Sequence, residues 1–232
     1  MKKNGVIDMS KQETTKINCP KCDKEHDFTI WSSINVTLDP DKKEAVLNRK
    51  AFTFECPDCK EKTLYTYDFL YHDMEQKVMI YHVTTNEALV QAMEGFAQMK
   101  NIEGGDGILN GPEVEGYKKR IVRSLNELRE KIFIFDAGLD DRVVEIFKVF
   151  CIIQLKQNDP NFQADEAYFF SRDGEIGFQF LREGKAFGEV EIDPADYEDI
   201  AKTAAGILAK DDQENCYVID TNWAYKNMSE ED

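Results

Sequence analysis

Four cysteines in two matching motifs are the residues of this 232-residue chain whose spacing points to a definite chemistry. Each motif reads Cys-Pro-x-Cys, and 33 residues separate the first motif from the second. A Cys-x-x-Cys turn directs two thiolates at one point, and two such turns together supply the four sulfurs of a tetrahedral metal site. The spacing therefore predicts a closed site with four protein ligands, which are Cys19, Cys22, Cys56 and Cys59.

Three chemistries are open to such a set of thiols. Structural Zn²⁺ accounts for both motifs at once, and it is the cofactor that we predict. An iron site of rubredoxin type uses the same four sulfurs, so iron remains an alternative. A thiol redox function would need a thiolate at the N-terminus of a helix, and neither motif opens a convincing helix.

No catalytic residue emerges from the rest of the sequence, and we lean towards a protein that is not an enzyme. The three histidines, His26, His72 and His82, are not needed as ligands because four cysteines already fill a tetrahedron. No nucleophile motif, phosphate-binding loop or His-Glu-x-x-His motif occurs. Cys151 and Cys216 lie in apolar surroundings and are expected to be buried thiols without a redox role.

The residues around the two motifs are typical of short strands that would hold the thiols in place. We predict a flexible N-terminus at 1–13 and a zinc-ribbon-like antiparallel β domain at 14–84. Asp39 as a cap and Pro40 in the first turn predict a short helix over 42–48 between the motifs. Alternation of apolar and polar residues predicts strands at 28–31, 34–38, 51–55, 62–68 and 77–83.

Helical periodicity dominates the middle of the chain, from 86 to 160. It predicts helices over 86–99 and 117–135, and a third helix that Asp140 or Asp141 caps and that ends near Gln157. This third helix is apolar nearly all round and should be buried. Glycines and a proline place a loop at 101–114.

The last part, 161–227, is predicted to be a small α+β unit that precedes a charged tail at 228–232. Strands are expected at 168–171, 176–181 and 186–192, with turns at Asp173-Gly174 and Glu183-Gly184. Pro194 opens a helix to about Ala209, and a short strand is expected at 216–219. The aromatic residues of the strands are expected to form core rather than a binding face. The whole chain is thus assigned to the α+β class.

Charge and composition narrow the classes of partner and compartment. The net charge is −16, with 13 Lys/Arg against 14 Asp/Glu in residues 1–83 and 16 against 31 in the remainder. Nucleic acid is disfavoured because no basic run supplies phosphate contacts. The sequence shows no secretion signal and no stretch of roughly 20 apolar residues, so we expect no membrane span and a reducing cytoplasmic location.

The segments around the motifs resemble the CpXC family of bacterial and archaeal proteins over about residues 17–160. The resemblance implies metal binding by the four cysteines and assigns no role to other residues. Glycine follows a motif in many members, whereas Asp23 and Lys60 stand at those positions here. Besides the motifs, the resemblance rests on Ser33-Ile34-Asn35-Val36, Leu38-Asp39-Pro40, Leu70-Tyr71-His72-Asp73-Met74 and Phe135-Asp136-Ala137-Gly138-Leu139-Asp140-Asp141.

Three functions are compatible with these observations. The first is a non-catalytic zinc-binding module whose acidic, aromatic-bearing C-terminal half contacts an unidentified protein partner. The second is an enzyme or enzyme subunit with a site between the two halves of the chain, using His72 or His82. The third is a zinc ribbon that binds nucleic acid. The sequence favours the first.

Overall fold

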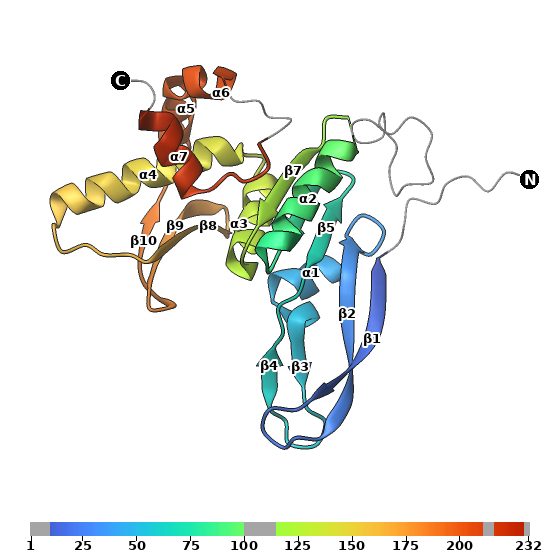
Figure 1. Ribbon diagram of the computed structural model, residues 1–232. Helices are drawn as coiled ribbons and strands as arrows, with labels where there is room; N and C mark the ends of the chain where they lie inside the picture. Colours follow the sequence, from blue (N-terminus) through green and yellow to red (C-terminus); the bar gives the residue numbers. More distant parts are fainter. Residues whose placement is uncertain (1–9, 100–114, 211–215, 230–232) are drawn as a thin grey trace, which may run out of the picture. The chain divides into compact units, whose positions relative to one another are not determined.

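The computed structural model describes residues 10–99, 115–210 and 216–229, which belong to two compact units (Figure 1). Unit 1 extends to Leu125 and unit 2 begins at Asn126. Each unit contains both helices and strands, which confirms the predicted α+β class. Within the described ranges, no helix is long and apolar enough to cross a membrane.

A five-stranded sheet in the order β1-β2-β5-β6-β7 forms the frame of unit 1. Antiparallel pairing joins β1 to β2 and β5 to β6, whereas the β2–β5 and β6–β7 pairs are parallel. Helix α2 (Asn86–Gln98) begins at the Thr85 side-chain cap, and its Phe96 packs edge-on to Tyr81 of β6. The five strands are Lys11–Asn18, Glu25–Asn35, Phe69–Asp73, Val78–His82 and Lys118–Val122.

A second, two-stranded sheet carries the other cysteine motif. It pairs β3 (Thr53–Glu55) with β4 (Lys62–Leu64), and it follows helix α1 (Asp41–Leu47) and the short 3-10 helix η1 (Lys50–Phe52). Figure 1 shows this hairpin beside the β1–β2 hairpin, in the order β4, β3, β2, β1. Aromatic rings pack between the two hairpins, with the Phe28 and Phe54 centroids 6.0 Å apart.

Helix α4 (Asp141–Asn158) lies at the centre of unit 2. One side contacts the sheet β10-β9-β8, where Phe147 packs edge-on to Phe178. Ile146 and Val149 on the other side join an apolar cluster with Ala204 and Trp223. The remaining elements are α3 (Leu125–Asp136), β8 (Glu166–Arg172), β9 (Glu175–Arg182), β10 (Lys185–Glu191), α5 (Pro194–Thr203), α6 (Ala205–Lys210) and α7 (Thr221–Ser229).

Several predicted elements are confirmed. Helices α1, α2 and α4 lie where they were predicted, and Asp140 caps α4 by accepting a hydrogen bond from the Arg142 N–H. The three strands of unit 2 and both of their turns are present. Most of the aromatic residues of those strands form core, as predicted: Phe169, Phe170, Phe178 and Phe180 are buried, whereas Tyr168 is partly exposed and Phe187 is 45% exposed.

The predicted helix over 117–135 is wrong in its first part. Residues Lys118–Val122 form β7, and helix α3 starts only at Leu125. β7 pairs along its whole length with β6, and Ile121 and Val122 are buried in that pairing. The β-branched residues Ile121 and Val122 favour a strand. The pairing of β7 with β6 outweighed the helical spacing of the apolar residues, which by chance continues from this segment into α3.

Several smaller predictions are also corrected. Asp39 does not cap α1, because Pro40 occupies the cap position and the Asp39 carboxylate accepts a hydrogen bond from the Ser10 N–H. Strands β1 and β5 were not anticipated, β1 begins inside the N-terminus that was expected to be flexible, and residues 216–219 form no strand. Helix α7 covers residues that were assigned to the end of the last unit and to its tail. The predicted loop at 101–114 and most of the predicted flexible N-terminus lie outside the described residues.

Candidate metal centre

The two cysteine motifs fold into turns with the same hydrogen bonds. In the first, the Cys19 N–H donates to the Lys24 carbonyl and the Asp23 N–H donates to the Cys19 carbonyl, each at 2.9 Å. In the second, the N–H of Cys56 donates to the Glu61 carbonyl at 2.8 Å, and the N–H of Lys60 donates to the Cys56 carbonyl at 3.0 Å. Each turn joins two strands of a hairpin, so the strands fix the direction of its thiols.

The residue after each motif adopts a left-handed backbone conformation. Asp23 has a φ of 57° and Lys60 a φ of 61°. Glycine adopts this conformation without a steric penalty, whereas other residues are strained in it. These are the positions at which glycine follows the motif in many members of the family that the sequence resembles. The turn geometry is therefore kept here at a cost in backbone strain.

The turns bring all four predicted ligands together. Their sulfur atoms lie within 4.8 Å of one another, with Cys19 Sγ 3.6 Å from Cys59 Sγ and Cys22 Sγ 3.7 Å from Cys56 Sγ. A tetrahedral ion with metal–sulfur bonds of about 2.3 Å would separate its sulfurs by about 3.8 Å. A disulfide would require about 2.05 Å. The sulfur spacing thus fits a tetrahedral metal ion and not a pair of disulfides.

The four thiols ionise unequally in the absence of a cation. The Cys22 N–H donates to the Cys19 sulfur and lowers the pKa of Cys19 to about 7, although burial opposes this shift. The Lys24 N–H lowers the pKa of Cys22, but burial and the three neighbouring sulfurs outweigh it and raise that pKa to about 12. Four thiolates therefore require a bound cation to offset their mutual repulsion.

The surroundings hold the two turns against each other. Cys19 and Cys56 are 1% and 0% exposed and pack in one apolar cluster with Phe28 and Phe54. On the outside, two ion pairs connect the turns: Lys21 with Glu61 at 3.0 Å and Lys24 with Asp58 at 2.9 Å. Their lysines are largely exposed, so each pair contributes little by itself.

His26 is the site residue that the sequence did not identify. Its Nε2 lies 3.5 Å from Cys56 Sγ and 3.2 Å from Asp58 Oδ2, and its ring stacks near Phe54. A ring N–H in this position can donate to a thiolate sulfur, as second-sphere groups commonly do around metal ligands. The only feature of the sequence that points to a role for His26 beside the thiols is its place four residues after Cys22.

Comparison with known families identifies the chain. The family described as CpXC protein matches residues 17–148, more than half of the sequence and all four cysteines. The chain belongs to the CpXC family. The match covers β2 to β7 of this CpXC protein, together with the end of β1, all of α3 and the first part of α4. No curated protein and no solved structure matches the chain.

The two histidines considered as catalytic bases have structural surroundings in this CpXC protein. His72 is 5% exposed, and its ring nitrogens lie 3.4 Å from Asn35 Nδ2 and 3.2 Å from the Tyr117 hydroxyl. Burial lowers the pKa of His72, which favours the neutral ring. His82 is 1% exposed, and its Nδ1 lies 2.8 Å from the Tyr67 carbonyl oxygen. Both rings are thus enclosed by unit 1.

The two remaining cysteines lie away from the motifs. Cys151 is 8% exposed in α4, and burial raises the pKa of its thiol to about 11. This agrees with the prediction of an inert buried thiol. Cys216 is partly buried, and its thiol donates to the Val218 carbonyl at 3.8 Å.

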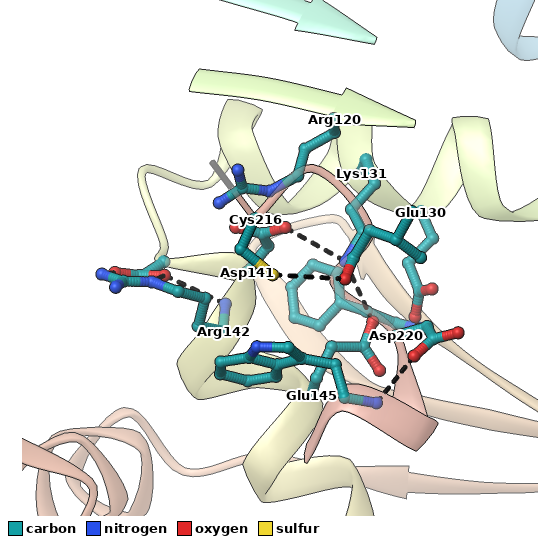
Figure 2. A network of polar contacts seen from close by, with 12 residues as sticks. Arg120, Glu130, Lys131, Asp141, Arg142, Glu145, Cys216 and Asp220 are labelled. Carbon is teal, nitrogen blue, oxygen red and sulfur yellow. Dashed lines mark hydrogen bonds and ion pairs between the residues drawn. The ribbon is translucent and has the colours of Figure 1, made fainter. Parts of the chain in front are cut away.

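Unit 2 contains a buried network of charged side chains on α3 and α4 (Figure 2). We call it the charged network. Lys148 pairs with Glu130 at 2.7 Å and with Glu145 at 2.9 Å, while Lys131 pairs with Glu145 at 3.0 Å and with Asp141 at 3.1 Å. None of the five residues is more than 3% exposed. Sequence analysis missed the network because charged residues on helices usually mark the solvent face.

The charged network connects the elements of unit 2. Glu130 accepts a hydrogen bond from the Phe169 N–H of β8 at 2.6 Å, and Glu145 accepts one from the Thr221 hydroxyl of α7 at 3.4 Å. Burial lowers the pKa of Lys148, but Glu130 and Glu145 outweigh it and raise that pKa, so its ammonium group stays charged. We interpret the network as structural, since buried ion pairs fix one arrangement of the elements that carry them.

Proposed function

We propose that this CpXC protein binds one structural Zn²⁺ ion through Cys19, Cys22, Cys56 and Cys59 and acts as a non-catalytic protein-interaction module. The observation that carries the proposal is the convergence of four thiols at tetrahedral spacing. Four protein ligands complete the coordination of zinc, so no position is left for a substrate or an activated water molecule. The metal then serves the fold rather than a reaction.

The part of unit 1 around the cysteines has little else to hold it. β3 and β4 are three residues each, and among the described residues the local apolar cluster has four buried members, Cys19, Phe28, Phe54 and Cys56, with partly buried side chains around them. Small β units of this kind commonly depend on a metal for stability. The free energy of metal binding then contributes directly to the free energy of folding, so the expected role of this site is to stabilise the fold.

An interaction role is the functional class that the remaining features favour. His72 and His82 are enclosed by neighbours, and the net charge of −16 disfavours nucleic acid. Four of the five aromatic residues of β8 and β9 are core, and only Tyr168 is partly exposed, which weakens the support for contact through the C-terminal half. A hollow of about 540 Å³ beside the cysteines offers a binding surface in unit 1 instead.

Elemental analysis of the purified full chain, combined with thiol titration, tests the metal. We expect one zinc per chain. In the native protein without chelator, none of the six thiols should react. A chelator should make the four motif thiols reactive, and unfolding should then expose the thiols of Cys151 and Cys216. Cys22→Ser should lose the metal, whereas Cys151→Ser, the matched control, should keep it. If the analysis finds one iron per chain instead, the site is the iron site of rubredoxin type. A metal-free chain with reactive motif thiols would overturn the proposal and favour redox chemistry.

The interaction role is tested with the tagged, metal-loaded full chain expressed in its own host. We expect a protein to co-purify in a fixed ratio with the wild-type chain and with Cys151→Ser, and not with Cys22→Ser. Thiol–disulfide exchange by the wild-type chain that Cys22→Ser abolishes would contradict the non-catalytic assignment.

A further inference from the structure

The hollow beside the cysteines lies between two strands that do not pair with each other. Residues of β2 line one side, residues of β3 line the other, and Lys50 and Ala51 lie at one end. β2 belongs to the five-stranded sheet and β3 to the two-stranded sheet, although Figure 1 shows them as neighbours. We call this space the strand groove. Its lining residues include Asp27, Thr29, Trp31, Thr53 and Glu55.

One edge of the groove is the unpaired side of β2. The Lys24 carbonyl accepts from Cys19 on the β1 side, whereas the Trp31 N–H donates to the Tyr67 hydroxyl on the other side. Backbone groups of a strand alternate between its two edges. Asp27 and Thr29 therefore direct their N–H and C=O groups away from β1. In the described part of the chain, these groups have no partner.

The other edge is the unpaired side of β3. The Phe52 carbonyl accepts from Tyr65, and the Cys56 N–H donates to Glu61, so both residues face the β4 side. By the same alternation, Thr53 and Glu55 face away from β4. The Thr53 N–H already donates to the Lys50 carbonyl. The Thr53 C=O and both backbone groups of Glu55 are left without a partner among the described residues.

Side chains below the strands keep the two edges apart. Phe28 and Phe54 meet edge to face with centroids 6.0 Å apart, and the His26 ring lies 5.8 Å from Phe54. These rings form an apolar base under the groove. β2 leaves the cysteine site and β3 returns to it, so the two strands run in opposite directions. A strand inserted between them would be parallel to one and antiparallel to the other.

We propose that the strand groove binds an extended peptide segment of a partner protein, which pairs with both edges and carries a carboxylate at the Lys50 end. This inference rests on the proposed interaction function and names the surface that performs it. Strand addition to an exposed edge is a common mode of peptide recognition, because main-chain hydrogen bonds supply affinity at any sequence. The unpartnered part of the β2 edge runs from Asp27 to Thr29 and ends before the Trp31 N–H, which already donates to the Tyr67 hydroxyl, so it matches about three residues of such a segment.

Charge decides the chemistry of the occupant. Asp27 is paired with Lys16 at 2.7 Å, and Glu55 is paired with Lys62 at 3.2 Å. The ammonium group of Lys50 is exposed and has no carboxylate partner within the described ranges. An acidic side chain or a terminal carboxylate of the peptide complements this charge. Two facing edges also admit a single strand, which limits the pairing to one segment and prevents growth into a larger sheet.

The probe is a phage-displayed library of random linear octapeptides, selected on the immobilised, metal-loaded full chain. The recovered peptide, synthesised with a fluorophore, is titrated with three chains by fluorescence anisotropy. Thr29→Pro removes an N–H that faces the groove. Thr14→Pro is the matched control, because Thr14 lies directly opposite Thr29 and its N–H faces the outer edge of β1. Metal content and thermal unfolding verify that both variants are folded.

We expect Thr29→Pro to weaken peptide binding at least about tenfold and Thr14→Pro to change it less than about twofold. Selected peptides should be enriched in acidic residues at one end. Lys50→Glu should weaken them, and the exposed Lys185→Glu in unit 2 should not. Equal losses for the two proline variants, or no peptide that distinguishes them, would overturn the groove as a binding site.

The outcome separates this inference from the function on which it rests. If a stoichiometric partner co-purifies equally with the Thr29→Pro and Thr14→Pro chains, the interaction module stands and the groove is refuted. If the wild-type chain holds no metal or shows thiol–disulfide exchange, the proposed function fails irrespective of the peptide titration.

Discussion

The backbone at Lys60 carries a cost that a single substitution can remove. Its φ of 61° lies in the left-handed region, which strains any residue with a Cβ atom. Lys60→Gly should relieve this strain, partly offset by the greater entropy of glycine in the unfolded chain. We expect a gain of about 0.5–1 kcal/mol in the free energy of unfolding, measured by urea denaturation in the presence of excess zinc.

The matched control is Lys62→Gly, two residues further along in β4. Glycine there has no strain to relieve and weakens a strand, so the free energy of unfolding should fall by about 0.5–1 kcal/mol. A stabilisation by both substitutions, or by neither, would show that the turn conformation is not the source of the effect.

His72 gives unit 1 a dependence on pH. Burial lowers the pKa of His72 below the value of 6.5 that it has in the unfolded chain. The unfolded state therefore binds the proton more readily, so stability is full above about pH 6.5 and is lost as the pH falls through the folded pKa. His72→Gln should make the unfolding free energy less dependent on pH between about 7 and 5, as measured by urea denaturation at several pH values.

Thiol protonation and metal release also act at low pH, so the difference between the wild-type and His72→Gln curves is the informative quantity. Identical slopes for the two proteins would contradict the assignment of this pH dependence to His72.

At the level of single residues, the sequence was a good guide where spacing imposes the geometry. The four cysteines were found because a Cys-x-x-Cys turn has few conformations. His26 was not found, because its approach to Cys56 depends on the packing of two hairpins that are distant in sequence. The five residues of the charged network were missed because charged residues on a helix usually mark its solvent face, and only the packing of α3 on α4 shows that these are buried.

Among the elements, α3 and α4 depend on each other through their buried charges. Lys148→Met leaves the carboxylates of Glu130 and Glu145 without one of their cationic partners in a site that water does not reach. Breaking a buried ion pair in this way costs about 3–5 kcal/mol. We expect a loss of this size in the free energy of unfolding of unit 2, followed by the near-ultraviolet circular dichroism of the full chain.

Lys156→Met, on an exposed turn of the same helix, is the control and should change stability by less than about 0.5 kcal/mol. Adding Glu130→Gln to Lys148→Met should recover part of the loss, because it removes the uncompensated charge. A loss from Lys148→Met that matches that of Lys156→Met would show that the network contributes no stability.

Elements with strong local patterns were predicted and those formed by distant pairing were not. The hairpins of unit 2 have turn residues and alternation within one short segment, and all three strands were found. β5 and β7 gain their definition from β2 and β6, which are distant along the chain. The helical spacing that continues from residue 117 into α3 therefore misled the prediction at β7.

At the scale of the whole molecule, the candidate metal site and the charged network belong to different units. Removal of the metal by a chelator should therefore unfold the hairpins around the cysteines and leave unit 2 intact. We expect amide hydrogen exchange to increase by orders of magnitude in β1 to β4 and to remain unchanged in α4 and β8 to β10. The measurement is exchange mass spectrometry of the full chain with and without chelator.

The Cys151→Ser chain should respond to the chelator as the wild type does, whereas Cys22→Ser should show the exposed pattern without it. Loss of protection in β8 to β10 on metal removal would mean that the two units do not unfold separately.

The separation of the two turns along the chain has a consequence for biosynthesis. Cys59 lies 37 residues beyond Cys22, so a ribosome adding about 5–20 residues per second completes the second turn roughly 2–7 s after the first. During that interval the nascent chain presents the two thiols of a half-built site, and no partner turn is there to close it. Oxidants and competing soft metals have their best access to Cys19 and Cys22 at this stage, before the finished protein exists.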